Sequence, residues 1–275
     1  MLVTPKTRGF TLIELLVAMT ISSIVMGVFV KLMLSTTRYR REVEARLETH
    51  QGLKAAIDAL TRDLRLAGSC MPAGNDFLAI SGVDSQTTDQ IGVHIGELFE
   101  GGCVNSTVTA TVAAGTTQIF VANAVGFRAG QRVYLIHPDT FGEFQTVRSV
   151  DAGNNSLVIS PGVARDYPVP TGVWAMQQRD YSIMSILGPP RLMLGIDGAR
   201  PQPMALGISR LDVRYRLREN CPPCTEVALP ADAAEWRLVT DVLIDLTARS
   251  ASPVAPGTFY TITEQIRVKP RNLLP

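Results

Sequence analysis

The stretch Phe10–Val30 reads FTLIELLVAMTISSIVMGVFV and contains 21 residues with one charge, Glu14. A run of roughly 20 apolar residues is long enough to cross a bilayer as a helix. Two cations, Lys6 and Arg8, precede it. A secretory signal peptide also has a basic start, but its apolar core is roughly 7–15 residues long and ends at an A-x-A-like cleavage site. No such site occurs before Lys31, so we predict a membrane-spanning helix over 10–30.

Glu14 is the unusual residue of this helix, because a carboxylate inside a spanning segment is costly and commonly marks a partner or a functional site. The run 10–30 holds no Lys, Arg or His that would pair with it. If the chain were cut after Gly9, the new α-amine of Phe10 would lie one helical turn from Glu14. That amine would neutralise the carboxylate within the chain or from a neighbouring copy.

The string Arg8–Val17 (RGFTLIELLV) resembles the processing and methylation site of type IV pilins and type II secretion pseudopilins. The resemblance implies that prepilin peptidase removes a leader peptide, residues 1–9, by cutting between Gly9 and Phe10, and then methylates Phe10. It implies that Glu14 aligns the subunit with other major and minor pilins on an inner-membrane assembly platform. The chain would first be a single-pass inner-membrane protein with a periplasmic head, and then part of a pilus at the cell surface.

Two departures from the usual pilin pattern bear on this resemblance. Major pilins have a helix-bending proline in this segment, whereas no proline lies between Phe10 and Gly68, so a minor pilin or pseudopilin is favoured. The charges beside the apolar run leave its orientation ambiguous, because the two cations before it are outnumbered by four after it, Lys31, Arg38, Arg40 and Arg41. The resemblance places the leader in the cytoplasm.

Residues 31–68 are predicted to continue the same helix as an amphipathic half, since the segment up to Ala67 has no proline and one glycine, Gly52. Gly68 is expected to end the helix in a left-handed cap, with Pro72 soon after. The whole helix would be about 85 Å long. Its outer half would pack on the head through apolar residues at approximately helical spacing, Val43, Leu47, Leu53, Ile57, Leu60 and Leu64.

The helix is predicted to end with Asp63–Gly68 (DLRLAG), which is similar to a D-L-R-x-A-G ending in PilW-like minor pilins and GspJ-like pseudopilins. The segments 243–250 and 271–272 also resemble the end of such proteins. Nearer the membrane, Arg38–Arg41 (RYRR) has the clustered cations of a phospholipid or DNA patch. We favour a solvated helix face, because charge runs are commonly solvated. The formal charge of the whole chain, +1, lends nucleic-acid binding no support.

Charge differs along the chain, with eight Lys/Arg and five Asp/Glu over 31–67 and sixteen against nineteen over 68–275. Beyond Gly68, short β-branched runs alternate with Gly, Asn, Asp and Pro, the pattern of strands and turns. The predicted fold class is α+β: a long N-terminal helix, transmembrane then amphipathic, packed on an antiparallel β-sheet head over 69–275, with a β-rich module inserted at about 106–176. A hairpin turn is expected at Asp151–Asn155. The candidate strands are Val108–Val112, Gln118–Val121, Arg132–Ile136, Phe144–Val150, Ser156–Ser160, Leu211–Leu217, Leu238–Thr247 and Phe259–Val268.

Four cysteines lie beyond the membrane segment, which suggests disulfides in an exported domain, with three connectivities open. We favour pairing Cys70 with Cys103 and Cys221 with Cys224. The second pair is also a C-x-x-C, which in redox enzymes opens a helix. Here it contains two prolines and lies between predicted strands, so a turn disulfide is favoured. Zinc is the minority alternative, because a second C-x-x-C pair is missing.

Catalytic motifs such as G-x-S-x-G, H-E-x-x-H and the P-loop are absent from the sequence. Metal-ligand spacing is also absent among the histidines, His50, His94 and His137. Oxygen ligands for Ca²⁺ are offered by three acids in or near predicted loops, Asp139, Glu143 and Asp151, although such acids are more commonly turn residues. We therefore expect no enzymatic activity, no metal and no cofactor.

The resemblance and the residue pattern together predict a minor pilin subunit of a type IV pilus with a role in pilus biogenesis. That role covers assembly initiation, the pilus tip, adhesion or motility. One alternative is a type II secretion pseudopilin, and another is an adhesin whose module at 106–176 binds a ligand. The least favoured alternative is a membrane-anchored thiol oxidoreductase that uses Cys221 and Cys224.

Overall fold

The computed structural model describes residues 11–72, 76–139, 141–185, 188–218, 225–255 and 257–272. A long N-terminal helix is followed by antiparallel sheets, which confirms the predicted α+β class. The elements are, in order, α1 (Leu12–Leu66), β1 (Ile80–Val83), β2 (Gln90–Gly96), β3 (Leu98–Phe99), β4 (Gly102–Cys103), β5 (Asn105–Thr107), β6 (Gln118–Phe120), β7 (Arg132–Ile136), β8 (Gly142–Asp151), β9 (Ser156–Ser160), β10 (Gly172–Met184), β11 (Arg191–Ile196), β12 (Gln202–Leu206), β13 (Ile208–Leu217), β14 (Glu226–Val227), α2 (Ala233–Leu238), β15 (Val239–Arg249) and β16 (Thr261–Val268).

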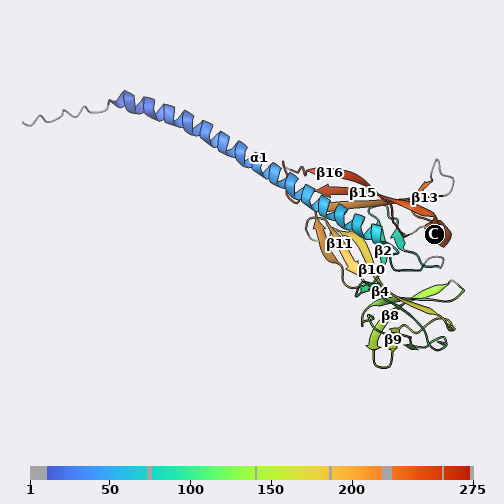
Figure 1. Ribbon diagram of the computed structural model, residues 1–275. Helices are drawn as coiled ribbons and strands as arrows, with labels where there is room; N and C mark the ends of the chain where they lie inside the picture. The colour runs from blue at the N-terminus through green and yellow to red at the C-terminus, as the bar shows by residue number, and fades with distance from the viewer. Residues whose placement is uncertain are drawn as a thin grey trace, which may run out of the picture.

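The helix α1 contains 55 residues, and its N-terminal half projects away from the head (Figure 1). At the other end Gly68 has a φ of +73°, the left-handed conformation expected of a residue that follows a helix. The N–H of Gly68 donates to the carbonyl oxygen of His94 on β2 at 2.9 Å. The helix therefore ends where the chain meets β2.

The face of α1 that packs on the head differs in part from the predicted one. Leu53, Leu60 and Leu64 are buried as expected, but the assignment of Val43 and Leu47 is wrong, because they are 44% and 57% exposed. The buried face continues instead through small side chains, Ala45, Thr49, Ala56 and Ala59. Small side chains keep the helix close to the sheets. A prediction based on the spacing of large apolar residues does not include these small residues.

Gly52 marks the closest approach between α1 and a sheet. A Cβ atom at this position would lie 2.2 Å from the carbonyl oxygen of Leu206, at the end of β12. Any other residue would push the strand away, so the single glycine in this half of the helix is a packing requirement.

Within the described residues the strands form antiparallel sheets of ten, four and two strands. The four-stranded sheet has the order β14-β13-β15-β16. The helix α1 contacts this sheet at β15 and β16, and it contacts the ten-stranded sheet at β2 and β12. The first apolar core lies where the helix and both sheets meet, and it includes Leu60, Ile91, Tyr181 and Ile244.

Part of the ten-stranded sheet closes into a barrel. β10 pairs with β5 along one edge and with β7 along the other, through the same residues, Gly172–Trp174. The pairing continues from β7 to β8, β9 and β6, and a bridge between Val108 and Val121 returns to the end of β5. Six of the described strands therefore form a ring around a second apolar core, drawn from residues 104–175.

The strand predictions succeed where the pattern is local. β7 and β9 have the predicted bounds, and β6, β8, β13, β15 and β16 end within three residues of them. The predicted strand Val108–Val112 is wrong, because in the described chain only isolated bridges occur there. The strands β1, β2, β10, β11 and β12 were not predicted. β10 contains the polar run Gln177–Asp180, which breaks the apolar alternation that marks a strand.

Candidate functional site

The N-terminal half of α1 is the part of the chain whose surface needs a partner. Every residue from Thr11 to Arg41 is exposed, including large apolar side chains such as Ile13, Ile24 and Phe29. Among the described residues α1 is a helix long and apolar enough to cross a membrane. A contiguous apolar surface of this size marks a membrane or a protein interaction site.

Glu14 has a partner within the chain, Thr11, which the sequence interpretation missed. Thr11 is the N-cap of α1, and its hydroxyl accepts the N–H of Glu14 at 3.4 Å. The Glu14 carboxylate in turn accepts the backbone N–H of Thr11 at 3.1 Å and its hydroxyl at 3.0 Å. This is a reciprocal capping box, readable from the T-x-x-E spacing. The processing residues Gly9 and Phe10 lie outside the described residues.

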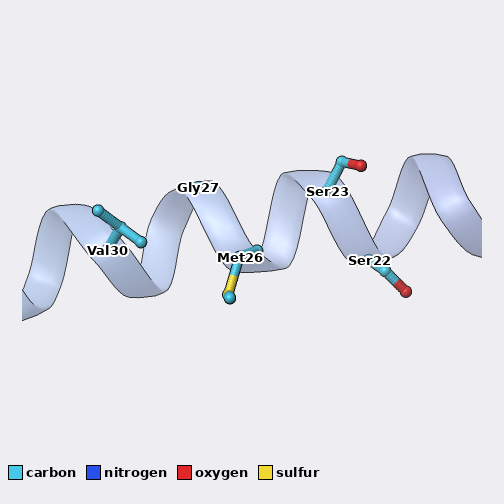
Figure 2. Close-up of a pocket in the computed structure, with 5 residues that line it drawn as sticks. All are labelled: Ser22, Ser23, Met26, Gly27 and Val30. Atoms are coloured by element: carbon cyan, nitrogen blue, oxygen red, sulfur yellow. The ribbon is translucent and has the colours of Figure 1, made fainter.

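An open hollow lies on the exposed half of α1, and Figure 2 shows the residues that line it, Ser22, Ser23, Met26, Gly27 and Val30. A hollow walled by a single helix has no opposite side, unlike a small-molecule site, which is concave and encloses most of its ligand. Nothing lies within 4 Å of a Cβ placed at Gly27. Small residues of this kind allow a second helix to approach closely.

The helix is anchored to the head by Asp63, the first residue of the DLRLAG segment. Its side chain is fully buried, and it accepts hydrogen bonds from the Arg179 guanidinium at 2.6 Å and from the Tyr181 hydroxyl at 2.5 Å. Burial and the Asp63 carboxylate both raise the pKa of Tyr181, so its hydroxyl stays protonated and remains a donor. Both partners are on β10, which continues into the barrel.

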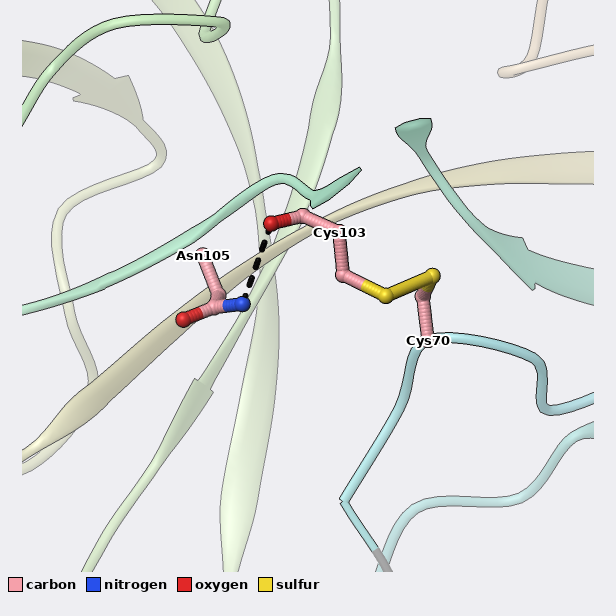
Figure 3. Close-up of a disulfide and its surroundings, with 3 residues drawn as sticks. All are labelled: Cys70, Cys103 and Asn105. Carbon is pink, nitrogen blue, oxygen red and sulfur yellow. Dashed lines mark hydrogen bonds between the residues drawn. A yellow bond between two sulfur atoms is a disulfide. The ribbon is translucent and has the colours of Figure 1, made fainter. Parts of the chain in front are cut away.

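A disulfide joins Cys70, just after α1, to Cys103 on β4, with 5.4 Å between the Cα atoms (Figure 3). The side chain of Asn105 donates to the carbonyl oxygen of Cys103 at 3.1 Å. The favoured pairing of these two cysteines is thus present in the structure. The other expected pair, Cys221 and Cys224, lies outside the described residues.

An aromatic joint connects the barrel to the rest of the head. Tyr134 on β7 and Phe144 on β8 have ring centroids 4.7 Å apart, and the ring of His94 on β2 lies 5.3 Å from Phe144. Burial raises the pKa of Tyr134 to about 12. Burial also lowers the pKa of His94, whose Nδ1 lies 2.6 Å from the Leu78 carbonyl oxygen. Both side chains are therefore uncharged near pH 7.

The comparison with known proteins bears on the exposed helix. Residues 4–30 match the family described as the prokaryotic N-terminal methylation motif. The chain is 40% identical over 62 residues to the pilin-like protein PilA3 of Thermus thermophilus, over 22% of this chain and 27% of that protein. The chain is type IV pilin-like. It matches little more than a quarter of the relative's length, so the β-rich head is not explained by this relative.

A weaker likeness joins this pilin-like chain to a solved structure, the Gp54 tailspike of Acinetobacter baumannii bacteriophage AP22 in complex with A. baumannii capsular saccharide. The likeness has a TM-score of 0.24 and 16% sequence identity, and it covers 31% of this chain and 15% of the tailspike. Similarity at this level supports no statement about fold or ligand.

The histidines of the pilin-like chain have separate surroundings. His94 belongs to the aromatic joint, and the Nε2 of His50 lies 3.3 Å from the Tyr260 hydroxyl. The ring of His137 stacks on Phe141 with centroids 4.1 Å apart. These contacts are those of packed side chains, and no two of the three histidines share a contact described here.

The three acids considered as calcium ligands also have partners of their own. The Asp151 carboxylate accepts hydrogen bonds from the Asn154 side chain and from two backbone N–H groups of the β8–β9 turn, and these bonds lower its pKa. Glu143 accepts the N–H of Ala164, and Asp139 lies 3.5 Å from the His137 ring nitrogen. Within the described part of the chain, no three His, Cys, Asp or Glu side chains form a group that could hold a metal ion.

Proposed function

We propose that the chain is a minor pilin of a type IV pilus that prepilin peptidase cuts after Gly9 and methylates on Phe10. Its apolar half would span the inner membrane, with the head in the periplasm, until an assembly platform passes it into a fibre with other pilins. The proposal assigns the protein a structural role without enzymatic activity. It rests above all on the methylation motif at 4–30, which coincides with a helix half that is exposed along its whole length.

The exposed half of α1 suits both stages of this proposal. In the membrane its apolar side chains would contact lipid. In the fibre they would contact neighbouring helices, and Ser22, Ser23 and Gly27 would permit close packing. Glu14 would then lie beside the amine of a processed neighbour while Thr11 holds its carboxylate at the end of the helix.

Processing can be tested by co-expression with a prepilin peptidase. The intact mass and the N-terminal sequence should show loss of residues 1–9 and one added methyl group on Phe10. A Gly9→Val variant should keep its leader. A native chain that still begins at Met1, or that begins beyond Val30, would contradict the proposal.

The role of Glu14 in assembly can be separated from its role in capping. Glu14→Ala should insert into the membrane yet enter fibres poorly. Thr11→Ala breaks the same capping box but keeps the carboxylate, so it should assemble much better. Glu44→Ala removes an exposed carboxylate from the same helix and serves as the control. Normal incorporation of Glu14→Ala would exclude the assembly role.

A type II secretion pseudopilin is the alternative within the same class, since it would use the same exposed helix. Deleting the gene separates the two, because loss of surface fibres supports the pilus and loss of an exported enzyme supports the secretion system. A tip adhesin is a second candidate, favoured by the barrel's own core. Its test is a deletion of about 106–176 that keeps assembly and abolishes adhesion.

A further inference from the structure

Four successive residues encircle α1 just above its apolar half. They are Arg38, Tyr39, Arg40 and Arg41. All four are exposed, and Tyr39 is 68% exposed. Successive residues of an α-helix are turned by about 100°, so four in a row cover its full circumference. They do so within about 4.5 Å along the axis. We call these four residues the cationic ring.

The arginines of the cationic ring have no partner inside the described chain. None of the three takes part in an ion pair or a side-chain hydrogen bond among the described residues. Glu42, the first acid after the ring, is bound to Arg46 at 2.6 Å. Glu44 lies one turn above Arg40 and forms no ion pair within the described residues either. Three positive charges therefore remain available at one level of the helix.

The position of the ring matches the headgroup layer of a bilayer. The exposed apolar side chains continue past Lys31 to Leu34, which is 57% exposed. From Leu12 to Leu34 the helix rises about 33 Å, close to the roughly 30 Å of a hydrocarbon core. Arg38 lies about 6 Å and Arg41 about 10.5 Å further on, and long arginine side chains can reach back into the layer between them and the core. The headgroup region on each side of that core is about 5–8 Å thick.

We propose that the cationic ring is more than the solvated helix face that the sequence favoured, and that it binds anionic lipid headgroups around α1, in the leaflet that faces the head. The inference rests on the proposed membrane-spanning role of the apolar half and assigns its lipid partner. Headgroups surround a spanning helix on all sides, as the ring does. A nucleic-acid duplex or another protein would contact one side and leave arginines on the opposite side without a partner. Tyr39 has the polar-tipped ring that is enriched at this interface.

Headgroup binding by the cationic ring gives a physical reason for the ambiguous charge pattern around the apolar run. Cations normally accumulate on the cytoplasmic side of a spanning helix. Here the ring lies on the head side, next to Ala45, the first buried residue of α1. Its charges would hold the helix at a fixed depth through headgroup contacts, with the head resting directly above the leaflet.

The test uses the full-length protein reconstituted in phosphatidylcholine vesicles that contain spin-labelled phosphatidylglycerol or spin-labelled phosphatidylcholine. The fraction of motionally restricted label reports which lipid contacts the helix. Each interfacial cation is expected to give about a fivefold preference for anionic lipid, so the native chain should prefer phosphatidylglycerol by about fivefold or more. The preference should fall several-fold in the triple variant Arg38→Gln, Arg40→Gln, Arg41→Gln, and the part that remains is assigned to Lys6, Arg8 and Lys31 at the ends of the apolar run.

A matched control removes three exposed cations from the head end of the molecule, Lys54→Gln, Arg65→Gln and Lys269→Gln. It should keep the native lipid preference. An equal loss in the control, or no preference in the native chain, would overturn the inference. A native chain that high-pH washing extracts from the vesicles would instead refute the membrane-spanning role. Binding of duplex DNA to the protein in neutral detergent tests nucleic acid as the alternative partner. If the native chain binds DNA but shows no lipid preference, and if only the triple variant loses DNA binding, the inference is overturned.

Discussion

Replacing Asp63 with alanine tests whether the buried carboxylate anchors α1 to the head. The change removes two acceptor oxygens, which lie 2.6 Å from the Arg179 guanidinium and 2.5 Å from the Tyr181 hydroxyl. Tyr181 is fully buried, so its hydroxyl would lose its acceptor without gaining water. The native interaction is therefore expected to contribute to the stability of the first core.

The expected loss follows from how far each partner is buried. An unsatisfied buried hydroxyl costs about 1–3 kcal/mol. The Arg179 side chain is 26% exposed and can turn to solvent, so the loss of its ion pair adds about 1 kcal/mol or less. Alanine also has a better helix propensity than aspartate, which returns about 0.5 kcal/mol. The net decrease in the free energy of unfolding should be about 2 kcal/mol.

Urea unfolding of the full-length protein in detergent measures this difference. A Trp174→Phe background leaves Trp236, which packs against the first core, as the fluorescent reporter. Asp58→Ala removes an exposed carboxylate from the same helix and should change stability by less than about 0.5 kcal/mol. Tyr181→Phe combined with Asp63→Ala should cost less than the sum of the two single changes. Equal stability of the native protein and Asp63→Ala would refute the anchoring role.

Three further changes probe other contacts by the same unfolding assay. Gly52→Ala should cost about 1–3 kcal/mol because its Cβ would lie 2.2 Å from a carbonyl oxygen of β12, whereas Gly27→Ala, with nothing within 4 Å, should leave the head unchanged. Replacing Cys70 and Cys103 with serine should cost about 3–4 kcal/mol, since the bridge links positions 33 apart, and reductant should cause an equal loss in a chain whose Cys221 and Cys224 are replaced by serine. Burial lowers the pKa of His94, so stability should be full above about pH 6.5 and fall as the pH drops below it, while His94→Gln should flatten this slope between pH 7.5 and 5.

The helix could be predicted from the sequence because its signals are local. The apolar run, the absence of proline and the glycine at position 68 are each visible within a few residues. The partner of Glu14 was missed because a cation was sought, although Thr11 stands at the spacing of a capping box. The packing face was partly missed because small residues such as Ala45 and Thr49 carry no hydrophobic signal.

The head could be predicted only where strands are β-branched and bounded by turn residues. β7 and β9 meet both conditions, and β10 does not, because its polar run at 177–180 is accounted for by contacts elsewhere in the fold. Arg179 is half-buried in this strand because its guanidinium donates a hydrogen bond to Asp63, which is far away in the sequence. Closure of the barrel also cannot be predicted from a local sequence pattern, since it depends on β5 and β7 pairing with the same residues of β10.

These non-local contacts meet at the end of α1. Within eight residues of the chain, Asp63 binds β10, the N–H of Gly68 bonds to β2, and Cys70 is bridged to β4. β10 belongs to both the first core and the barrel, so one short segment joins the projecting helix to both parts of the head. The DLRLAG segment is thus a structural junction, and changes there should disturb the head more than equal changes on the half of α1 that is exposed from Thr11 to Arg41.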